Sequence, residues 1–177
     1  MGVRIAEMND IATMSYIHSQ TWKIAYVDYI SHDYLSNIAD DGWIPLFSKA
    51  LREKIHEAAV FDLNGIVTGT ITFGQERMGE KSYGEGIKTE QINFEGEIIS
   101  LYVLPEYWST KQGYELMKFA VERLRQQGFE SCFLWVIRDN ERAVRFYKRF
   151  GFASTNELLT VNMAGRPLVE EKYRIML

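Results

Sequence analysis

The feature that most constrains the fold of this chain is the stretch Glu97–Tyr107, where an apolar segment meets a proline and then the start of a helix. Alternation predicts a buried strand over residues 94–104, with Ile98, Ser100, Tyr102 and Leu104 on one face and Ile99, Leu101 and Val103 on the other. After Pro105, helical spacing predicts a helix from Thr110 or Lys111 to Gln127. A strand that leads into a helix N-terminus is a place where proteins hold phosphates and other ligands.

The residues before this stretch predict a strand, several helices and a β-hairpin. Residues 3–5 suit a short strand, and helical spacing continues to about Ala25. Two β-rich runs, 57–63 and 66–75, flank Asn64-Gly65, a pair that favours a type I′ turn because both positions need positive φ. Asn9 or Asp10 is expected to cap the first helix and Asp40 or Asp41 a later one, while Ser31 and Asp33 open a short helical piece between them.

The residues after it predict a buried strand, a helix and a final hairpin. The run 131–137 is almost continuously apolar, as in a strand buried on both faces. Asp139 or Asn140 is expected to cap the next helix, which ends at Gly151. Two further strands follow, joined by a turn at residues 164–167. The whole chain, residues 1–177, is therefore predicted to form one α/β domain of the α+β type with a mixed sheet.

Composition excludes several classes of protein. A chain of 177 residues with a net charge of −4 has the length for a sizeable core and no basic excess for binding nucleic acid. Cys132 alone cannot form an intrachain disulfide, and the three histidines lie far apart, so no metal site is expected. No apolar run reaches the ~18 residues of a membrane helix, and a cytoplasmic location is expected.

The segment Asn140–Phe152 matches the pattern N-x-x-A-x-x-F-Y-x-x-x-G-F at each fixed position, directly after a strand. In this the chain resembles the GNAT superfamily of N-acetyltransferases. The run Thr21–Tyr26 is similar to the S-W-x-x-A-Y start of one subgroup, with Thr21 in place of serine. The resemblance implies a mixed, mostly antiparallel sheet flanked by helices, with acetyl-CoA as cosubstrate, and homodimers are common in the family.

The loop that binds the cofactor pyrophosphate is where the chain departs from the family. The family loop reads [RQ]-G-x-G-x-[GA], whereas this chain has Trp108-Ser109-Thr110-Lys111-Gln112-Gly113, of which Gly113 alone fits. The family's anion donors are mainly backbone N–H groups, so the loop can still hold a diphosphate if its backbone path survives. The alternative is a degenerate loop in a module that binds coenzyme A or a partner protein without catalysis.

Transfer of an acetyl group to an amine needs a base, an oxyanion donor and an acid for the thiolate. The resemblance implies Glu97 as the base, the Leu101 N–H as the oxyanion donor and Tyr147 as the acid. Glu95, two residues before Glu97 on the same face of the strand, is the alternative base. It implies that the cofactor is bound by residues of the strand, the loop and the last helix: Leu101, Tyr102, Val103, Trp108, Ser109, Thr110, Lys111, Gln112, Gly113, Asn140, Ala143, Phe146 and Tyr147.

Three of these residues also have a simpler structural interpretation. Tyr147 suits a core aromatic on an amphipathic helix, Asn140 an ordinary N-cap, and Glu97 an exposed strand end.

The acceptor is expected to be a primary amine of a small molecule or peptide, bound by Trp22, Tyr26 and Glu97. The segment 31–38 and the loop 76–93 are expected to line its site as well. Transfer of a different acyl group, or to an oxygen of the acceptor, remains a third reading of the same scaffold. The sequence thus predicts an acetyl-CoA-dependent N-acetyltransferase that acts by direct attack in a ternary complex.

Overall fold

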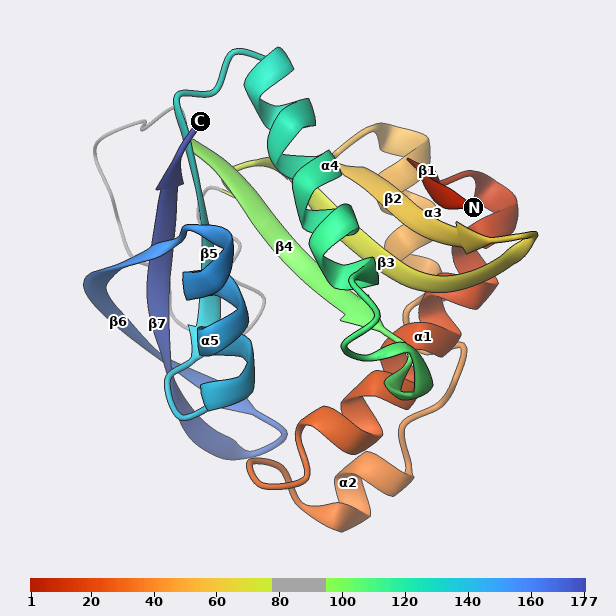
Figure 1. Ribbon diagram of the computed structural model, residues 1–177. Helices are drawn as coiled ribbons and strands as arrows, with labels where there is room; N and C mark the ends of the chain where they lie inside the picture. Colours follow the sequence, from red (N-terminus) through yellow and green to blue (C-terminus); the bar gives the residue numbers. More distant parts are fainter. Residues whose placement is uncertain (78–94) are drawn as a thin grey trace.

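The computed structural model describes residues 1–77 and 95–177, and these form a sheet with helices on both faces (Figure 1). The strands are β1 (Gly2–Ile5), β2 (Glu57–Leu63), β3 (Ile66–Gln75), β4 (Glu95–Val103), β5 (Ser131–Ile137), β6 (Ala153–Met163) and β7 (Arg166–Met176). The helices are α1 (Ile11–Ala25), α2 (His32–Ser36), α3 (Ile44–Glu53), α4 (Gln112–Gln126) and α5 (Glu141–Phe150), with short 3-10 turns η1 (Met8–Asp10) and η2 (Pro105–Tyr107).

The strand order is β1-β2-β3-β4-β5-β7-β6, and β4–β5 is the one parallel pair among the pairings of the described strands. This confirms the predicted mixed, mostly antiparallel sheet. The hairpin prediction is also confirmed, because Asn64 and Gly65 both have positive φ, 55° and 90°. The Asp62 carboxylate accepts a hydrogen bond from the Gly65 N–H, which holds the turn closed.

Strand β4 does not alternate strictly, because its register against β3 shifts near its middle. Thr72 pairs with Ser100 and the next residue of β3, Phe73, pairs with Ile98, so Ile99 is the extra residue of a β-bulge. The bulge places Ile98 in the same cluster as Val103, whereas Tyr102 packs against a different cluster that includes Trp22 of α1. The predicted grouping of Ile98 with Tyr102 is therefore wrong.

Helix α4 covers one face of the sheet, and α1 and α3 cover the other, as Figure 1 shows. Leu116 and Leu124 of α4 are fully buried against Ile71 and Phe73 of β3. Helix α4 lies so close to β4 that a Cβ at Gly96 would come within 2.9 Å of the Leu124 side chain. A glycine is thus needed there for close packing rather than for an unusual φ.

Two of the expected helix caps serve other contacts. Asp10 precedes α1, but its carboxylate accepts from Arg4 and from the Glu7 N–H, and these bonds lower its pKa against the effect of burial. Trp43, rather than Asp40 or Asp41, precedes α3. Asp40 instead accepts hydrogen bonds from side chains of α1, at Ser19, Gln20 and Lys23. A side chain that reaches α1 gains more partners than one local N–H would supply.

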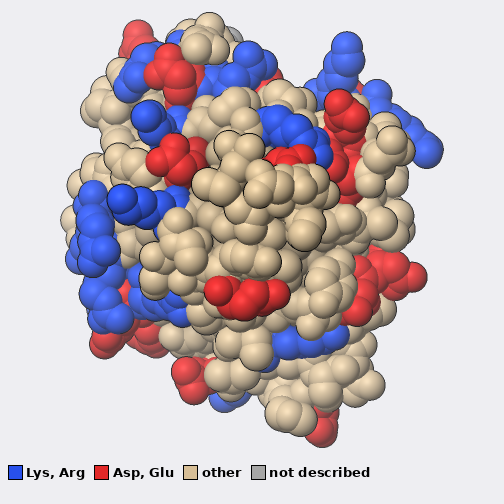
Figure 2. Space-filling view, turned by 45° about the vertical axis from the view of Figure 1, so that its right-hand side comes forward, with Lys and Arg blue, Asp and Glu red and all other residues tan. Residues whose placement is uncertain are grey.

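Charged side chains are unevenly spread over the surface. On the face in Figure 2, Lys and Arg gather along the left-hand edge, while most of the middle is uncharged. Among the residues the structure describes, no helix is long and apolar enough to cross a membrane.

Candidate active site

Strands β4 and β5 touch at one end and then separate. They pair only over Glu95–Glu97 with Ser131–Phe133, although both strands continue well beyond. From Leu134 on, β5 pairs only with β7 among the described strands. The sequence did not show this divergence, because it depends on which strands lie beside each other.

The divergence opens a cleft of about 1140 Å³. This volume exceeds the ~300–1,000 Å³ of ordinary ligand pockets, so an extended molecule fits. Its walls come from β4, β5, α1, α5 and the loop before α4. The predicted site residues among its lining are Tyr26, Leu101, Tyr102, Val103, Trp108, Ser109, Lys111, Gly113, Asn140, Ala143, Phe146 and Tyr147.

The backbone of β4 offers hydrogen-bonding groups to this cleft. The Leu104 N–H donates to the Thr68 carbonyl over 2.9 Å, so Leu104 and Thr68 form a hydrogen-bonded pair of the antiparallel ladder. Such pairs alternate, and the backbone groups of Leu101 and Val103 therefore point away from β3, toward the diverging β5. The Val103 carbonyl accepts from Thr21 Oγ1 and Trp108 Nε1. The N–H groups of Leu101 and Val103 lie where the sequence analysis expects cofactor contacts.

The loop before α4 keeps the backbone conformation of a glycine-rich loop. Ser109 and Lys111 stand where the family pattern has glycines, and both have left-handed φ values, 66° and 70°. Non-glycine residues rarely adopt this conformation. Space is also available at Gly113, where an added Cβ would make only ordinary contacts of 3.7–3.9 Å. The backbone path therefore survives the loss of the glycines, and these residues fit a diphosphate.

Helix α5 brings Asn140 and Tyr147 to the cleft. The Asn140 side chain accepts a hydrogen bond from the Ala143 N–H over 3.1 Å, which confirms the N-cap. Gly151 ends the helix with φ 121°. Tyr147 is half-buried between Phe146 and Phe152, and burial together with the nearby Tyr102 raises its pKa. A phenol with a raised pKa stays protonated near neutral pH, as a general acid must be before it transfers its proton.

On the α1 side of the cleft, three aromatic residues are joined by hydrogen bonds. Trp22 Nε1 donates to the Tyr102 hydroxyl over 3.0 Å, and the Tyr26 hydroxyl lies 3.1 Å from the same oxygen. Burial and the neighbouring Tyr102 raise the pKa of Tyr26. Tyr26 lines the cleft, whereas Trp22 lies behind it and supports Tyr102. The His18 ring packs edge-on against the Tyr102 ring, at a centroid distance of 4.4 Å.

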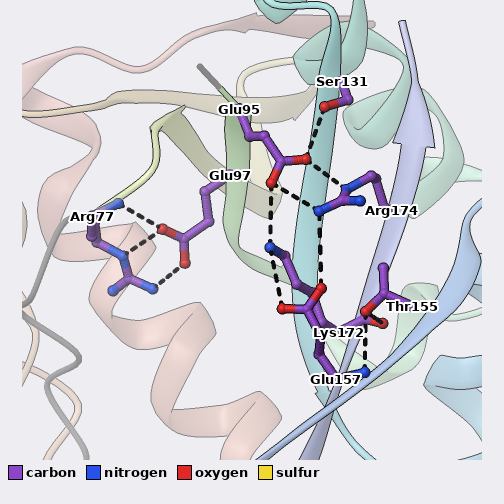
Figure 3. Close-up of polar contacts among 8 residues, drawn as sticks. All are labelled: Arg77, Glu95, Glu97, Ser131, Thr155, Glu157, Lys172 and Arg174. Atoms are coloured by element: carbon purple, nitrogen blue, oxygen red, sulfur yellow. Dashed lines mark hydrogen bonds and ion pairs between the residues drawn. The ribbon is translucent and has the colours of Figure 1, made fainter. Parts of the chain in front are cut away.

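Glu97 does not line the cleft, where the wall contributed by β4 begins at Ile98. Its carboxylate is buried and held by Arg77, through a two-pronged guanidinium contact of 2.6 and 3.0 Å and through the backbone N–H (Figure 3). Its role as base stays a prediction.

Glu95 belongs to a second buried network, with Ser131, Lys172 and Arg174 (Figure 3). Burial opposes its ionisation, but the bonds from Ser131 and Arg174 outweigh burial and lower its pKa. Glu95 therefore ties β4 to β5 and β7.

Two predicted loop residues also point elsewhere. The Gln112 side chain is buried and accepts from Thr68 Oγ1 over 2.7 Å, toward β3. Thr110 Oγ1 donates to the Tyr107 carbonyl within the loop. Neither side chain lines the cleft, so any contact they make with a phosphate would come from the backbone. The loop 76–93 was expected to line the acceptor site, and its residues 78–93 lie outside the described part of the chain.

Two charged residues of the cleft lining are not among the site residues predicted from the sequence. Arg142, in the first turn of α5, lies over the Trp108 ring at 3.7 Å from its centroid. Glu170 of β7 also lines the cleft and contributes to the raised pKa of Tyr26. For Arg142 the signal was an arginine two residues after the helix cap Asn140, within the segment that matches the family pattern. For Glu170 it was an acidic residue within a strand of alternating character.

The comparisons with known proteins agree with this geometry. Residues 20–152 match the model of the acetyltransferase (GNAT) family. The chain belongs to the GNAT family. As a GNAT protein it is 30% identical over 155 residues to the uncharacterized N-acetyltransferase YuaI of Bacillus subtilis, covering 84% of this chain and 78% of that one. It is 26% identical over 153 residues to the spermidine N(1)-acetyltransferase of Thermoplasma acidophilum, covering 85% and 86%.

The fold of this GNAT chain is also that of solved relatives. The Salmonella typhimurium protein yncA, solved with its cofactor acetyl-CoA, superposes with a TM-score of 0.69, covering 98% of this chain and 92% of that one at 19% identity. At this identity the likeness supports the fold alone.

Proposed function

We propose that the protein transfers the acetyl group of acetyl-CoA to a primary amine by direct attack in a ternary complex. One observation carries the proposal: the glycine-like backbone at Ser109 and Lys111 opens onto a cleft that also holds Tyr147 and the free side of β4. The family model and the N-acetyltransferase relatives support the same activity. A non-catalytic module is less favoured, because the loop keeps the required path.

The donor supplies an activated acetyl carbon, and the chain supplies the groups that act on it. The Leu101 N–H, directed away from β3, donates to the oxygen that becomes negative when the amine attacks. The carbon–sulfur bond then breaks, and Tyr147 gives its proton to the departing thiolate. The thiol that forms has a pKa of ~8.5, so the departing thiolate takes up a proton near neutral pH. The Asn140 side chain caps α5 through the Ala143 N–H and so fixes the first turn of the helix that carries Tyr147.

Two carboxylates compete for the role of base. Glu97 is the residue implied by the family resemblance, but to act it must work from its contact with Arg77, through water or after that contact opens. Glu170 is the second candidate because it lines the cleft near Tyr26. An amine of pKa ~10.4 is mostly protonated near neutrality, so removal of the base should shift the pH–rate profile toward higher pH.

The acceptor site is proposed on the α1 side, where Tyr26 and Tyr29 line the cleft with acidic neighbours. Asp28 and Asp139 contribute to the raised pKa of Tyr29, after burial, and both line the cleft. Aromatic faces and carboxylates together favour a cationic amine. The relative named as a spermidine acetyltransferase supports a small polyamine as the first acceptor to try. A cytoplasmic location and a homodimer stay predictions from the sequence.

The test is an assay of coenzyme A thiol release with acetyl-CoA and a panel of polyamines, amino-terminal peptides and simple amines. We expect acetylation of at least one amine, with the product identified by mass. Binding of acetyl-CoA without thiol release across the panel would favour the non-catalytic module. Comparison of Glu97→Gln with Glu170→Gln then assigns the base, because only the variant that lacks it shifts the pH–rate profile.

A further inference from the structure

The first position of the loop before α4 holds a tryptophan where the family pattern has Arg or Gln. The Trp108 indole is fixed in place, because its Nε1–H donates to the Val103 carbonyl over 2.7 Å. The bond fastens the ring to the end of β4, at the mouth of the cleft. The position has thus lost a polar side chain and gained a rigid aromatic face.

A cation from another element covers that face. The guanidinium carbon of Arg142 lies 3.7 Å from the centre of the Trp108 ring. Planar guanidinium groups stack well on aromatic rings and keep their N–H groups free at the edge for phosphate. A charge that the first position of the loop lacks is therefore present beside it, held by contact between residues 34 positions apart.

Nothing in the described residues neutralises this charge. Arg145, one turn further along α5, pairs with Glu141 at 2.8 Å, but no carboxylate of the described residues lies within ion-pair distance of Arg142. Lys111 of the loop lines the same cleft and likewise has no ion-pair partner in the parts of the chain that are described. Two cations without counter-ions at one end of a cleft favour an anionic ligand group.

Lys111 also occupies a costly backbone position. Its left-handed φ of 70° is the conformation for which a glycine is the easiest choice. A lysine at this position strains the backbone, and in return it supplies an ammonium group. This contrast separates the two roles of the position, because Gly would relieve the strain and remove the charge, whereas Met removes only the charge.

We propose that Arg142 and Lys111 bind the phosphate groups of coenzyme A, with Arg142, stacked on Trp108, replacing the polar side chain that the family loop carries at its first position. The proposal rests on the function proposed above and adds the two side chains to its backbone donors. The phosphates in question are either the diphosphate or the 3′-phosphate of coenzyme A, which share the same chemistry.

The test is calorimetric binding of coenzyme A and of dephospho-coenzyme A to the full chain at low and high salt. We expect Arg142→Gln and Lys111→Met each to weaken coenzyme A binding about tenfold at low salt, with a smaller loss at high salt because screening weakens the wild-type contacts. Trp108→Leu should weaken binding several-fold by removing the platform. Lys118→Gln, an equal loss of charge on the exposed face of α4, should leave affinity unchanged and is the control.

A separate measurement uses the unliganded protein. Lys111→Gly should raise the thermal midpoint while it weakens coenzyme A binding, whereas Lys111→Met should weaken binding without raising the midpoint. If the losses persist with dephospho-coenzyme A, the cations bind the diphosphate, and if they vanish, they bind the 3′-phosphate.

The outcomes separate this proposal from the function it rests on. Unchanged affinity in both Arg142→Gln and Lys111→Met, in a wild-type protein that binds coenzyme A, would overturn the inference and leave the proposed function standing. A wild-type protein that binds no coenzyme A would instead overturn the function.

Discussion

The indole N–H of Trp22 donates to the hydroxyl of Tyr102 over 3.0 Å, and this bond joins α1 to β4 directly beside the cleft. An indole can only donate, so the Tyr102 oxygen must accept. The same oxygen lies 3.1 Å from the hydroxyl of Tyr26. The aromatic side chains of the proposed acceptor site are thereby held against β4, the strand that carries the proposed oxyanion donor.

Tyr102→Phe should weaken folding and acceptor binding together. The change leaves the Trp22 N–H without its acceptor in a buried site, which costs about 1–3 kcal/mol. We expect a lower urea midpoint and a higher KM for the amine, with coenzyme A affinity unchanged because the backbone remains. A double-mutant cycle with Trp22→Phe should give a coupling energy of about 0.5–1.5 kcal/mol, and full additivity would show that the bond has no energetic weight.

Tyr147→Phe should lower kcat about 10²-fold, because the thiolate would leave without a proton from the chain. Phe keeps the ring contacts with Phe146 and Phe152, so folding should be little affected. Since the pKa of Tyr147 is raised, the wild-type acid stays protonated through mildly alkaline pH, and no loss of activity there should come from it. Steady-state kinetics measure kcat for wild type and Tyr147→Phe. Tyr173→Phe is the control, because Tyr173 is buried and does not line the cleft. Full activity in Tyr147→Phe would remove the assignment.

His18 should make the protein less stable in acid. Burial lowers its pKa from 6.5 to about 3, and its Nε2 has no hydrogen-bond partner among the described residues. The unfolded chain therefore binds more protons between pH 6.5 and 3, so this part of the stability is present above pH 6.5 and is lost as the pH falls toward 3. The loss should approach about 1.4 kcal/mol per pH unit within the window.

Urea unfolding at a series of pH values measures this slope. His18→Gln should reduce it in that window, although the variant itself is less stable at pH 7. The exposed His32 provides the matched control, since His32→Gln should leave the slope as it is. An equal slope in wild type and His18→Gln would show that other groups cause the acid sensitivity.

Gly96→Ala should destabilise the protein by about 1–3 kcal/mol. A Cβ there would lie 2.9 Å from both terminal carbons of Leu124, which is closer than atoms can pack, so the fully buried Leu124 side chain or α4 itself must move. Gly2→Ala is the control, because nothing lies within 4 Å of its added Cβ. Denaturant unfolding of both variants measures the difference, and equal stabilities would mean that α4 adjusts freely.

The sequence predicted correctly those turns and helix ends that depend on neighbouring residues alone. The Asn64-Gly65 turn, the Asn140 cap and the end of α5 at Gly151 follow from φ preferences and short-range hydrogen bonds, and the structure has all three. The family pattern added the mixed, mostly antiparallel sheet.

Features that depend on distant partners could not be read from the chain. The extra residue Ile99 exists only in relation to β3, and the separation of β4 from β5 depends on the strand order. Arg142 lies over the Trp108 ring, and the Glu97 carboxylate is held by Arg77 outside the cleft lining. In each case a residue far along the chain decides what the side chain can do.

The network around Glu95 has a mechanical consequence for the cleft. Glu95 is bonded to Ser131, Lys172 and Arg174 at the point where β4 and β5 still pair, and the strands separate over the roughly six residues that follow. At ~3.3 Å per residue this is an arm of ~20 Å, so a rotation of about 5° at the paired end would move the open end by nearly 2 Å. A small change at the paired end of the strands would thus alter the width available to a bound cofactor, through polar side chains that do not line the cleft.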